Sequence, residues 1–260
     1  MKLAFSTLGC PDLAVPEIID LARRGAYDGV ELRAVDGTID LFALPDFAPS
    51  RAPATAARFA AAGLRIACLD SSVSIDGALE SRDRDEALRN LELAALLDTP
   101  LVRVFAGPPS TDTDGLADGL CALGEAAEGF GVRVAVETHG AMSRSRELMS
   151  ILEGVPERVG VVWDVMHTFR AGETVGESLE LVRTRLAHVH LRDAASAGPA
   201  HDYVRTGEGM MPIGTVVRAL DEVGYAGYLS FEWEKFWHPE LEDGREVIPH
   251  FATCLREVMA

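Results

Sequence analysis

The chain has 260 residues, of which 48% are hydrophobic, and a formal net charge of −17. This length suits one large domain, and the hydrophobic content excludes an intrinsically disordered chain. The negative charge, with no basic run or basic helical face, argues against a nucleic-acid partner because phosphate binding depends on clustered Lys and Arg.

The cysteines and the apolar segments bear on the compartment. The four cysteines are far apart and form no CxxC pair, which is typical of reduced thiols in a cytosolic protein. Residues 1–5 are too short to be the apolar part of a secretion signal, and no apolar stretch reaches membrane-spanning length. We therefore expect a cytoplasmic protein with no membrane partner.

Short apolar runs alternate with amphipathic segments along the whole chain. The runs are typical of buried strands, and the amphipathic segments repeat apolar residues at helical spacing. The expected strands cover residues 2–6, 29–33, 64–69, 101–105, 132–137, 159–164, 186–190 and 228–232. The expected helices cover residues 15–24, 54–62, 81–97, 116–130, 143–152, 174–186, 213–223 and 247–259. This alternation predicts an α/β fold, a (β/α)8 TIM barrel that forms a single domain over residues 1–260.

The connections between these elements support the same fold. Residues 7–11, after the first strand, lack the GxGxxG spacing of a dinucleotide-binding fold, and no Gly-, Pro- or Ser-rich linker divides the chain. Longer connections follow the second and seventh strands, at residues 35–51 and 193–212. Because both leave the carboxyl ends of strands, we expect both to overhang the catalytic face.

Each of the last four expected strands ends in a residue type that binds metals. These residues are Glu137, Asp164, His190 and Glu232. Polar groups at buried strand ends are costly unless they are paired or bound to a metal. Parallel strands point the same way, so the four ends should converge on one face. An isolated member could simply bond to backbone or form an ion pair, but four in succession predict a shared divalent-metal site.

The donor set indicates which ions fit. Three carboxylates and one imidazole suit Mn²⁺, Zn²⁺, Mg²⁺ or Co²⁺, and the set lacks the thiolates of a structural zinc site. His188 shares a strand face with His190 but lies deeper, so we expect His190 to be the ligand.

Other polar residues follow the strand ends and are candidates for substrate contacts. His167 can return over the site from the turn after Asp164, although an ordinary loop histidine fits the same position. Arg192 and Lys235 can hold a substrate oxygen, although exposed surface charges are an equally good interpretation. The complete set of candidate substrate contacts is His167, Arg192, His139, Glu31, His238 and Lys235.

The predicted site suits proton transfer next to a carbonyl. A divalent ion bound to adjacent carbonyl and hydroxyl oxygens acidifies the C–H between them and stabilises the resulting enediolate. Glu137 and Glu232 can then act as base and acid, which gives isomerisation or epimerisation. If the next carbon carries a leaving hydroxyl, the same arrangement gives β-elimination of water.

Several segments resemble the xylose isomerase-like TIM barrel superfamily, the sugar phosphate isomerase/epimerase group. They are DGVELR (28–33), VETH (136–139), WDVMH (163–167), HVHLRD (188–193), GEG (207–209) and SFEWEK (230–235). The resemblance implies that Glu137, Asp164, His190 and Glu232 bind the metal. It further implies that the two glutamates move the proton and that His167 contacts a substrate oxygen. Members of this family often form dimers or tetramers, so a homodimer or homotetramer is expected.

The superfamily also contains endonuclease IV, from which this chain departs. In this chain the third and fourth expected strands end without a histidine, and residues 201–205 (HDYVR) lack the Asp-x-His step of the nuclease. The primary hypothesis is therefore a metal-dependent isomerase or epimerase acting on a small sugar or polyol. The alternatives are a metal-dependent dehydratase of keto-inositol or dehydroshikimate type, and a non-catalytic sugar-binding barrel.

Overall fold

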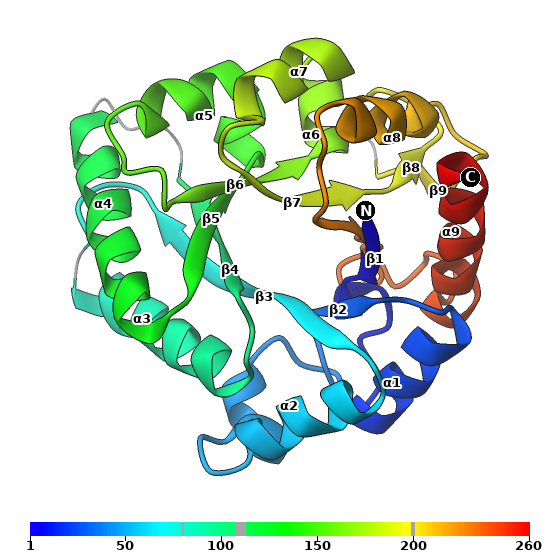
Figure 1. Cartoon of the computed structure of the whole chain (residues 1–260), viewed down its shortest axis with the longest axis horizontal. Coiled ribbons are helices and arrows are strands. Elements are labelled where there is room, and N and C mark those ends of the chain that lie inside the picture. The colour runs from blue at the N-terminus through cyan, green and yellow to red at the C-terminus, as the bar shows by residue number, and fades with distance from the viewer. Residues whose placement is uncertain (80, 108–112, 199–200) are drawn as a thin grey trace. The chain divides into compact units, whose positions relative to one another are not determined.

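The computed structural model describes residues 1–79, 81–107, 113–198 and 201–260. Strands and helices alternate along these residues (Figure 1). The long strands are β1 (Lys2–Phe5), β2 (Gly29–Leu32), β3 (Arg65–Ile75), β4 (Leu101–Ala106), β5 (Arg133–Glu137), β6 (Gly160–Asp164), β7 (Leu186–Leu191) and β10 (Tyr228–Phe231). The α-helices are α1 (Val15–Arg24), α2 (Ala52–Ala61), α3 (Ser81–Leu96), α4 (Thr113–Phe130), α5 (Ser145–Leu152), α6 (Val165–Arg170), α7 (Val175–Val182), α8 (Ile213–Glu222) and α9 (Gly244–Met259).

The eight long strands hydrogen-bond in the order β1-β10-β7-β6-β5-β4-β3-β2. The pairs β1–β10, β3–β4, β4–β5 and β5–β6 are parallel, and Lys2 lies opposite Tyr228 in the first of them. A parallel bridge between Ser6 and Glu31 also links the ends of β1 and β2. This order confirms the predicted (β/α)8 TIM-barrel class.

The chain divides into two compact units. The terminal unit comprises residues 1–67, 96–98 and 190–260, and the central unit comprises residues 68–95 and 99–189. Strands β3 and β7 each begin in one unit and end in the other. Each unit is described by itself below.

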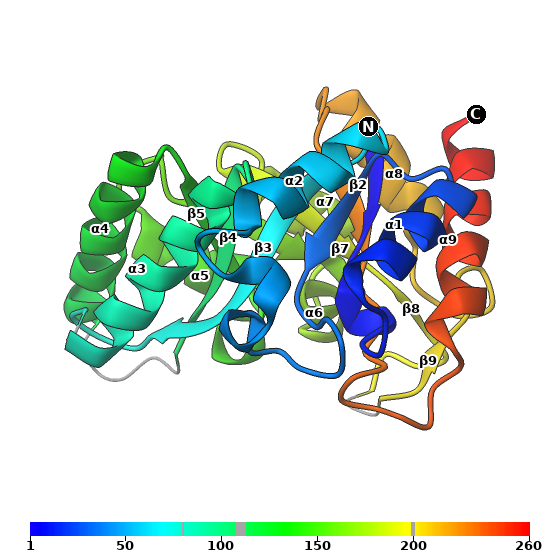
Figure 2. The ribbon, with the colours of Figure 1, turned by 90° about the horizontal axis from the view of Figure 1, so that it is seen from below.

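In the terminal unit, α1 lies beside α9 (Figure 1, Figure 2). Helix α1 begins with Pro16 in its first turn, and the side chain of Glu17 accepts a hydrogen bond from the Ala14 N–H. The helix buries Ile18 and Leu21. The Tyr27 hydroxyl follows this helix and donates to the Ile248 carbonyl of α9 at 2.6 Å, which ties the two ends of the chain together.

In the central unit, α4 packs against β5 and α5 (Figure 1). Helix α4 buries Leu116, Leu120 and Leu123, as the apolar spacing predicts. Strand β5 is buried on both faces from Val134 onwards and ends at Glu137. Helix α4 therefore covers a strand that carries a polar side chain at its carboxyl end.

Strand β3 is longer than predicted. The expected strand ended at residue 69, whereas β3 continues to Ile75 with an irregular register between Asp70 and Ser74 against β4. Its extension alternates buried Val73 and Ile75 with exposed Ser72 and Ser74. The serines concealed this alternation because the prediction used continuous apolar runs as its strand signal.

The connection after β7 is more ordered than predicted. A short antiparallel pair, β8 (Asp193–Ala194) and β9 (Tyr203–Val204), lies within residues 193–212, although residues 199 and 200 lie outside the described ranges. Across the described part of the chain, no helix combines the length and apolar character needed to cross a membrane.

Candidate metal and catalytic centre

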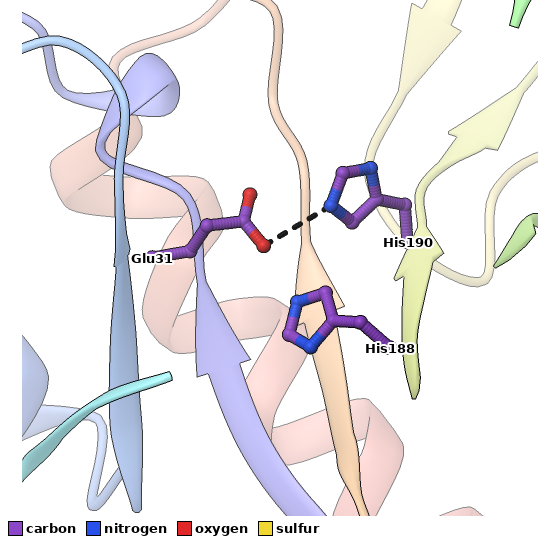
Figure 3. Close-up of side chains that lie close together, drawn as sticks. All are labelled: Glu31, His188 and His190. Atoms are coloured by element: carbon purple, nitrogen blue, oxygen red, sulfur yellow. Dashed lines mark hydrogen bonds and ion pairs between the residues drawn. The ribbon is translucent and has the colours of Figure 1, made fainter. Parts of the chain in front are cut away.

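In the terminal unit, three buried metal-type ligands lie together. Glu31 is on β2, His190 on β7, and Glu232 directly after β10. Each offers one ligand atom, and these atoms lie within 4.8 Å of one another. The Glu31 Oε2 atom lies 3.0 Å from His190 Nε2 (Figure 3), and Glu232 Oε2 lies 3.4 Å from His190 Nδ1. The imidazole thus has a carboxylate at each nitrogen.

Glu232 is also held by Arg192. The Arg192 guanidinium donates a hydrogen bond to Glu232 and lies 3.5 Å from Glu234. Burial raises the pKa of Glu232, but the charges of His190 and Arg192 outweigh burial and hold that pKa well below its usual range. Glu232 is therefore a carboxylate at neutral pH.

In the central unit, Glu137 and Asp164 form the corresponding pair. Both are buried, and their ligand atoms lie within 4.8 Å of each other. The Glu137 carboxylate lies 3.2 Å from Arg103 of β4, and Arg103 lies 3.4 Å from Asp70 of β3. One buried guanidinium therefore faces two carboxylates from the neighbouring strands.

Asp164 has a second role as the N-cap of α6. Its Oδ1 atom accepts a hydrogen bond from the His167 backbone N–H at 3.0 Å. The sequence predicted a tight turn here, and the structure has the helix Val165–Arg170 instead, because a capping aspartate satisfies its first N–H groups. The helix places the His167 ring edge-on to His139 at 4.6 Å between centroids. His167 Nε2 lies 3.8 Å from Asp164 Oδ2.

His188 precedes His190 by two residues on β7 and is likewise buried (Figure 3). The alternation of a strand puts both rings on the same face.

Two candidate substrate contacts of the terminal unit lie in the loop after β10. The Lys235 ammonium donates hydrogen bonds to the carbonyls of Pro239, at 2.6 Å, and Leu241. The His238 Nδ1 atom lies 3.3 Å from Glu240, and the His238 ring lies 4.2 Å from that of His201. In this structure Lys235 organises its own loop, and His238 forms part of an imidazole pair.

Three polar residues of these clusters were not among the predicted site residues. Asp70 and Arg103 are buried charges within strands, and a charged residue in a buried strand requires a partner, which is the signal that could have identified them. Asp193 accepts hydrogen bonds from the backbone N–H groups of Ala194, Gly207, Gly209 and Met211. It therefore shapes the loop after β7, and only the folded loop reveals this role.

The donors present fit a divalent ion. Buried carboxylate oxygens and an imidazole nitrogen are ligands that Mn²⁺, Zn²⁺, Mg²⁺ and Co²⁺ accept. Each unit supplies at least two such donors at strand ends. The chemistry of the side chains is therefore compatible with a metal centre.

A family model described as xylose isomerase-like TIM barrel matches residues 19–254. The chain belongs to this family. Among curated proteins it is similar to fructoselysine 3-epimerase from Escherichia coli O157:H7, with 28% identity over 161 residues. This match covers 59% of the chain and 58% of the relative, so the chain spans little more than half the length of that protein.

Solved structures have the same fold. The probable 3-DHS dehydratase AsbF of Bacillus anthracis, involved in petrobactin synthesis, matches with a TM-score of 0.83 and 16% identity over 98% of this chain and 99% of that one. The IolI protein, solved with a bound zinc atom, matches with a TM-score of 0.81 and 19% identity over 100% of this chain and 98% of that one. The curated relatives therefore include an epimerase, and the proteins that share the fold include a probable dehydratase.

Proposed function

We propose that this chain is a divalent-metal-dependent sugar epimerase or isomerase. In this proposal Glu137, Asp164, His190 and Glu232 hold one divalent ion, and Glu137 and Glu232 also transfer the proton. The main support is that both glutamates are buried at strand ends beside an arginine of their own unit. Glu137 lies beside Arg103, and Glu232 lies beside Arg192. A binding module has no need of two such carboxylates.

The bound ion would polarise the carbonyl and hydroxyl oxygens of a sugar and so acidify the C–H between them. One glutamate removes this proton as a carboxylate. In epimerisation the other glutamate, in its protonated form, delivers a proton to the opposite face of the same carbon. In isomerisation the proton returns to the neighbouring carbon, and the proton of the hydroxyl group passes to the former carbonyl oxygen.

Three of the predicted residues, His139, His167 and Arg192, would contact the substrate. His139 and His167 lie together in the central unit, and Arg192 lies beside Glu232 in the terminal unit. These donors suit hydroxyl and carbonyl oxygens, so a small sugar or polyol is the proposed substrate class. We further propose that the protein acts without a nucleic-acid partner, as its charge of −17 indicates, and forms a homodimer or homotetramer.

The test is hydrogen exchange from deuterated water into fructoselysine and free ketohexoses, with Mn²⁺, Co²⁺, Zn²⁺ or Mg²⁺ added. We expect the wild type to incorporate deuterium at the epimerised carbon. Glu137→Gln and Glu232→Gln should each lower turnover by about 10²–10⁴-fold. If the protein is an epimerase, each variant keeps a glutamate on only one face of the reacting carbon. Each variant should therefore exchange the C–H of only one of the two epimers, and slowly.

Glu222→Gln is the matched control, because Glu222 is an exposed glutamate at the end of α8. It should leave exchange unchanged. If no substrate exchanged hydrogen with the wild type while sugars still bound, the chain would be a non-catalytic sugar-binding barrel.

A metal-dependent dehydratase is the second candidate. The observation that favours it is the pair of buried carboxylates itself, since the same base also serves β-elimination when a hydroxyl lies on the next carbon. AsbF, a probable 3-DHS dehydratase with the same fold, is consistent with this alternative. An unsaturated product that absorbs in the ultraviolet, formed from a keto-inositol or from dehydroshikimate, would favour the dehydratase over the epimerase.

A further inference from the structure

Glu31 is buried on β2 and has a direct bond to the predicted metal ligand His190. Its Oε2 atom lies 3.0 Å from His190 Nε2, and both side chains are fully buried (Figure 3). A hydrogen bond across this distance forms when the imidazole carries a proton on Nε2 and the Glu31 oxygen accepts it. The Glu31 carboxylate therefore favours a proton on Nε2 of His190.

The other ring nitrogen then faces the remaining carboxylate of this cluster. His190 Nδ1 lies 3.4 Å from Glu232 Oε2. With Nε2 held by Glu31, Nδ1 is the nitrogen that can give up its proton and offer a lone pair to a cation beside Glu232. The geometry thus assigns the two nitrogens of one ring to different partners.

We propose that Glu31 is a positioning residue that holds His190 through Nε2 and thereby makes Nδ1 the metal-binding atom. The proposal rests on the proposed metal-dependent function and gives Glu31 this role in place of the substrate contact expected from the sequence. Metal-binding histidines generally donate their second N–H to a carboxylate or carbonyl, which fixes the ring and raises its basicity. Both partners are buried, and a hydrogen bond is stronger in such low-dielectric surroundings than in water.

The first measurement uses metal-free protein labelled with ¹⁵N at histidine. The His190 Nε2–H proton should exchange slowly with solvent in the wild type and rapidly in Glu31→Ala. The His190 signal is identified among the seven histidines by its loss in His190→Gln. His188→Gln serves as the neighbouring control and should leave this signal in place.

The second measurement uses protein loaded with ¹¹³Cd²⁺, an ion whose nucleus couples to a directly bound nitrogen. We expect coupling to Nδ1 of His190 and none to Nε2. Calorimetric titration with Mn²⁺ should show a 10–100-fold loss of affinity in Glu31→Ala. Glu31→Gln retains an oxygen acceptor, so its loss should be smaller. Glu222→Gln should bind Mn²⁺ like the wild type.

Cadmium coupling to Nε2 would overturn the proposal, as would Mn²⁺ affinity and Nε2–H exchange that Glu31→Ala leaves unchanged. The Gln variant keeps the test valid if the Ala variant fails to fold. Wild-type protein that binds neither ion would overturn the proposed function and the assignment of Nδ1. In that case the Nε2–H exchange alone would still decide whether Glu31 positions His190.

Discussion

The guanidinium of Arg103 lies 3.2 Å from the carboxylate of Glu137, and both side chains are only 2% exposed. Arg103 also lies 3.4 Å from the buried Asp70. A charge buried at this depth is costly unless opposite charges surround it. The Arg103 guanidinium, in the middle of the adjacent strand β4, thus holds the Glu137 carboxylate that is proposed to transfer the proton.

Removing that positive charge should destabilise the central unit. We expect Arg103→Met to lower the free energy of unfolding by about 3–5 kcal/mol, because it deprives two buried carboxylates of the guanidinium they share. Urea denaturation followed by circular dichroism measures this loss. Arg183→Met is the control: Arg183 forms an exposed ion pair with Glu180, so its loss should cost less than about 1 kcal/mol. Equal losses in the two variants would contradict the prediction.

Metal binding should raise the stability of the protein. A ligand that binds only the folded state at 100 times its Kd adds about 2.7 kcal/mol. We expect thermal unfolding to shift upwards with Mn²⁺, Co²⁺ or Zn²⁺ and to return with EDTA. Asp164→Asn should abolish the gain while keeping α6 intact, because asparagine is as good an N-cap as aspartate. A metal-induced shift that persists in Asp164→Asn would argue against this ligand.

The loop after β7 should depend on the space beside Gly209. A Cβ atom at this position would overlap the Asp193 carboxylate and the Ala194 carbonyl oxygen. Gly209→Ala should therefore cost about 1–3 kcal/mol and break the hydrogen bonds that Asp193 accepts. Hydrogen–deuterium exchange of residues 205–211 should become faster. Gly129→Ala is the control, since its Cβ would meet nothing within 4 Å and helix α4 favours alanine. Unchanged exchange in Gly209→Ala would refute this role of Asp193.

Stability should fall at alkaline pH in a way that depends on Tyr27. Burial raises the pKa of Tyr27 well above its ordinary value of 10.0. Because the folded pKa is the higher one, its stabilisation is complete below pH 10 and decreases as the pH rises further, when the unfolded chain ionises first. Tyr27→Phe should lose about 1 kcal/mol at neutral pH with the bond to Ile248, and its stability should fall less steeply above pH 10. The urea concentration at the midpoint of unfolding is measured for both proteins from pH 8 to 11. An equal fall of this midpoint with pH in the wild type and in Tyr27→Phe would contradict the prediction.

Much of the candidate site was predictable because it depends on local patterns. Glu137, Asp164 and His190 end apolar runs that form strands, and Glu232 directly follows such a run, so spacing alone placed them at strand ends. The extent of β3 was not predictable in this way, because its serine-containing half is buried on only one face. The helix α6 was not predictable from apolar runs either, because it is only six residues long and begins at Asp164, whose side chain caps the His167 N–H.

The alternation of elements, the TIM-barrel class and the strand-end carboxylates were determined by the sequence itself, since hydrophobic periodicity acts over a few residues. Only the tertiary structure decided that Arg103 bridges Asp70 and Glu137, that Glu31 lies against Nε2 of His190, and that Asp193 shapes its loop. These partners are far apart in the chain or depend on a folded loop. A buried charge must have a partner, but no local pattern states which residue the fold brings to it.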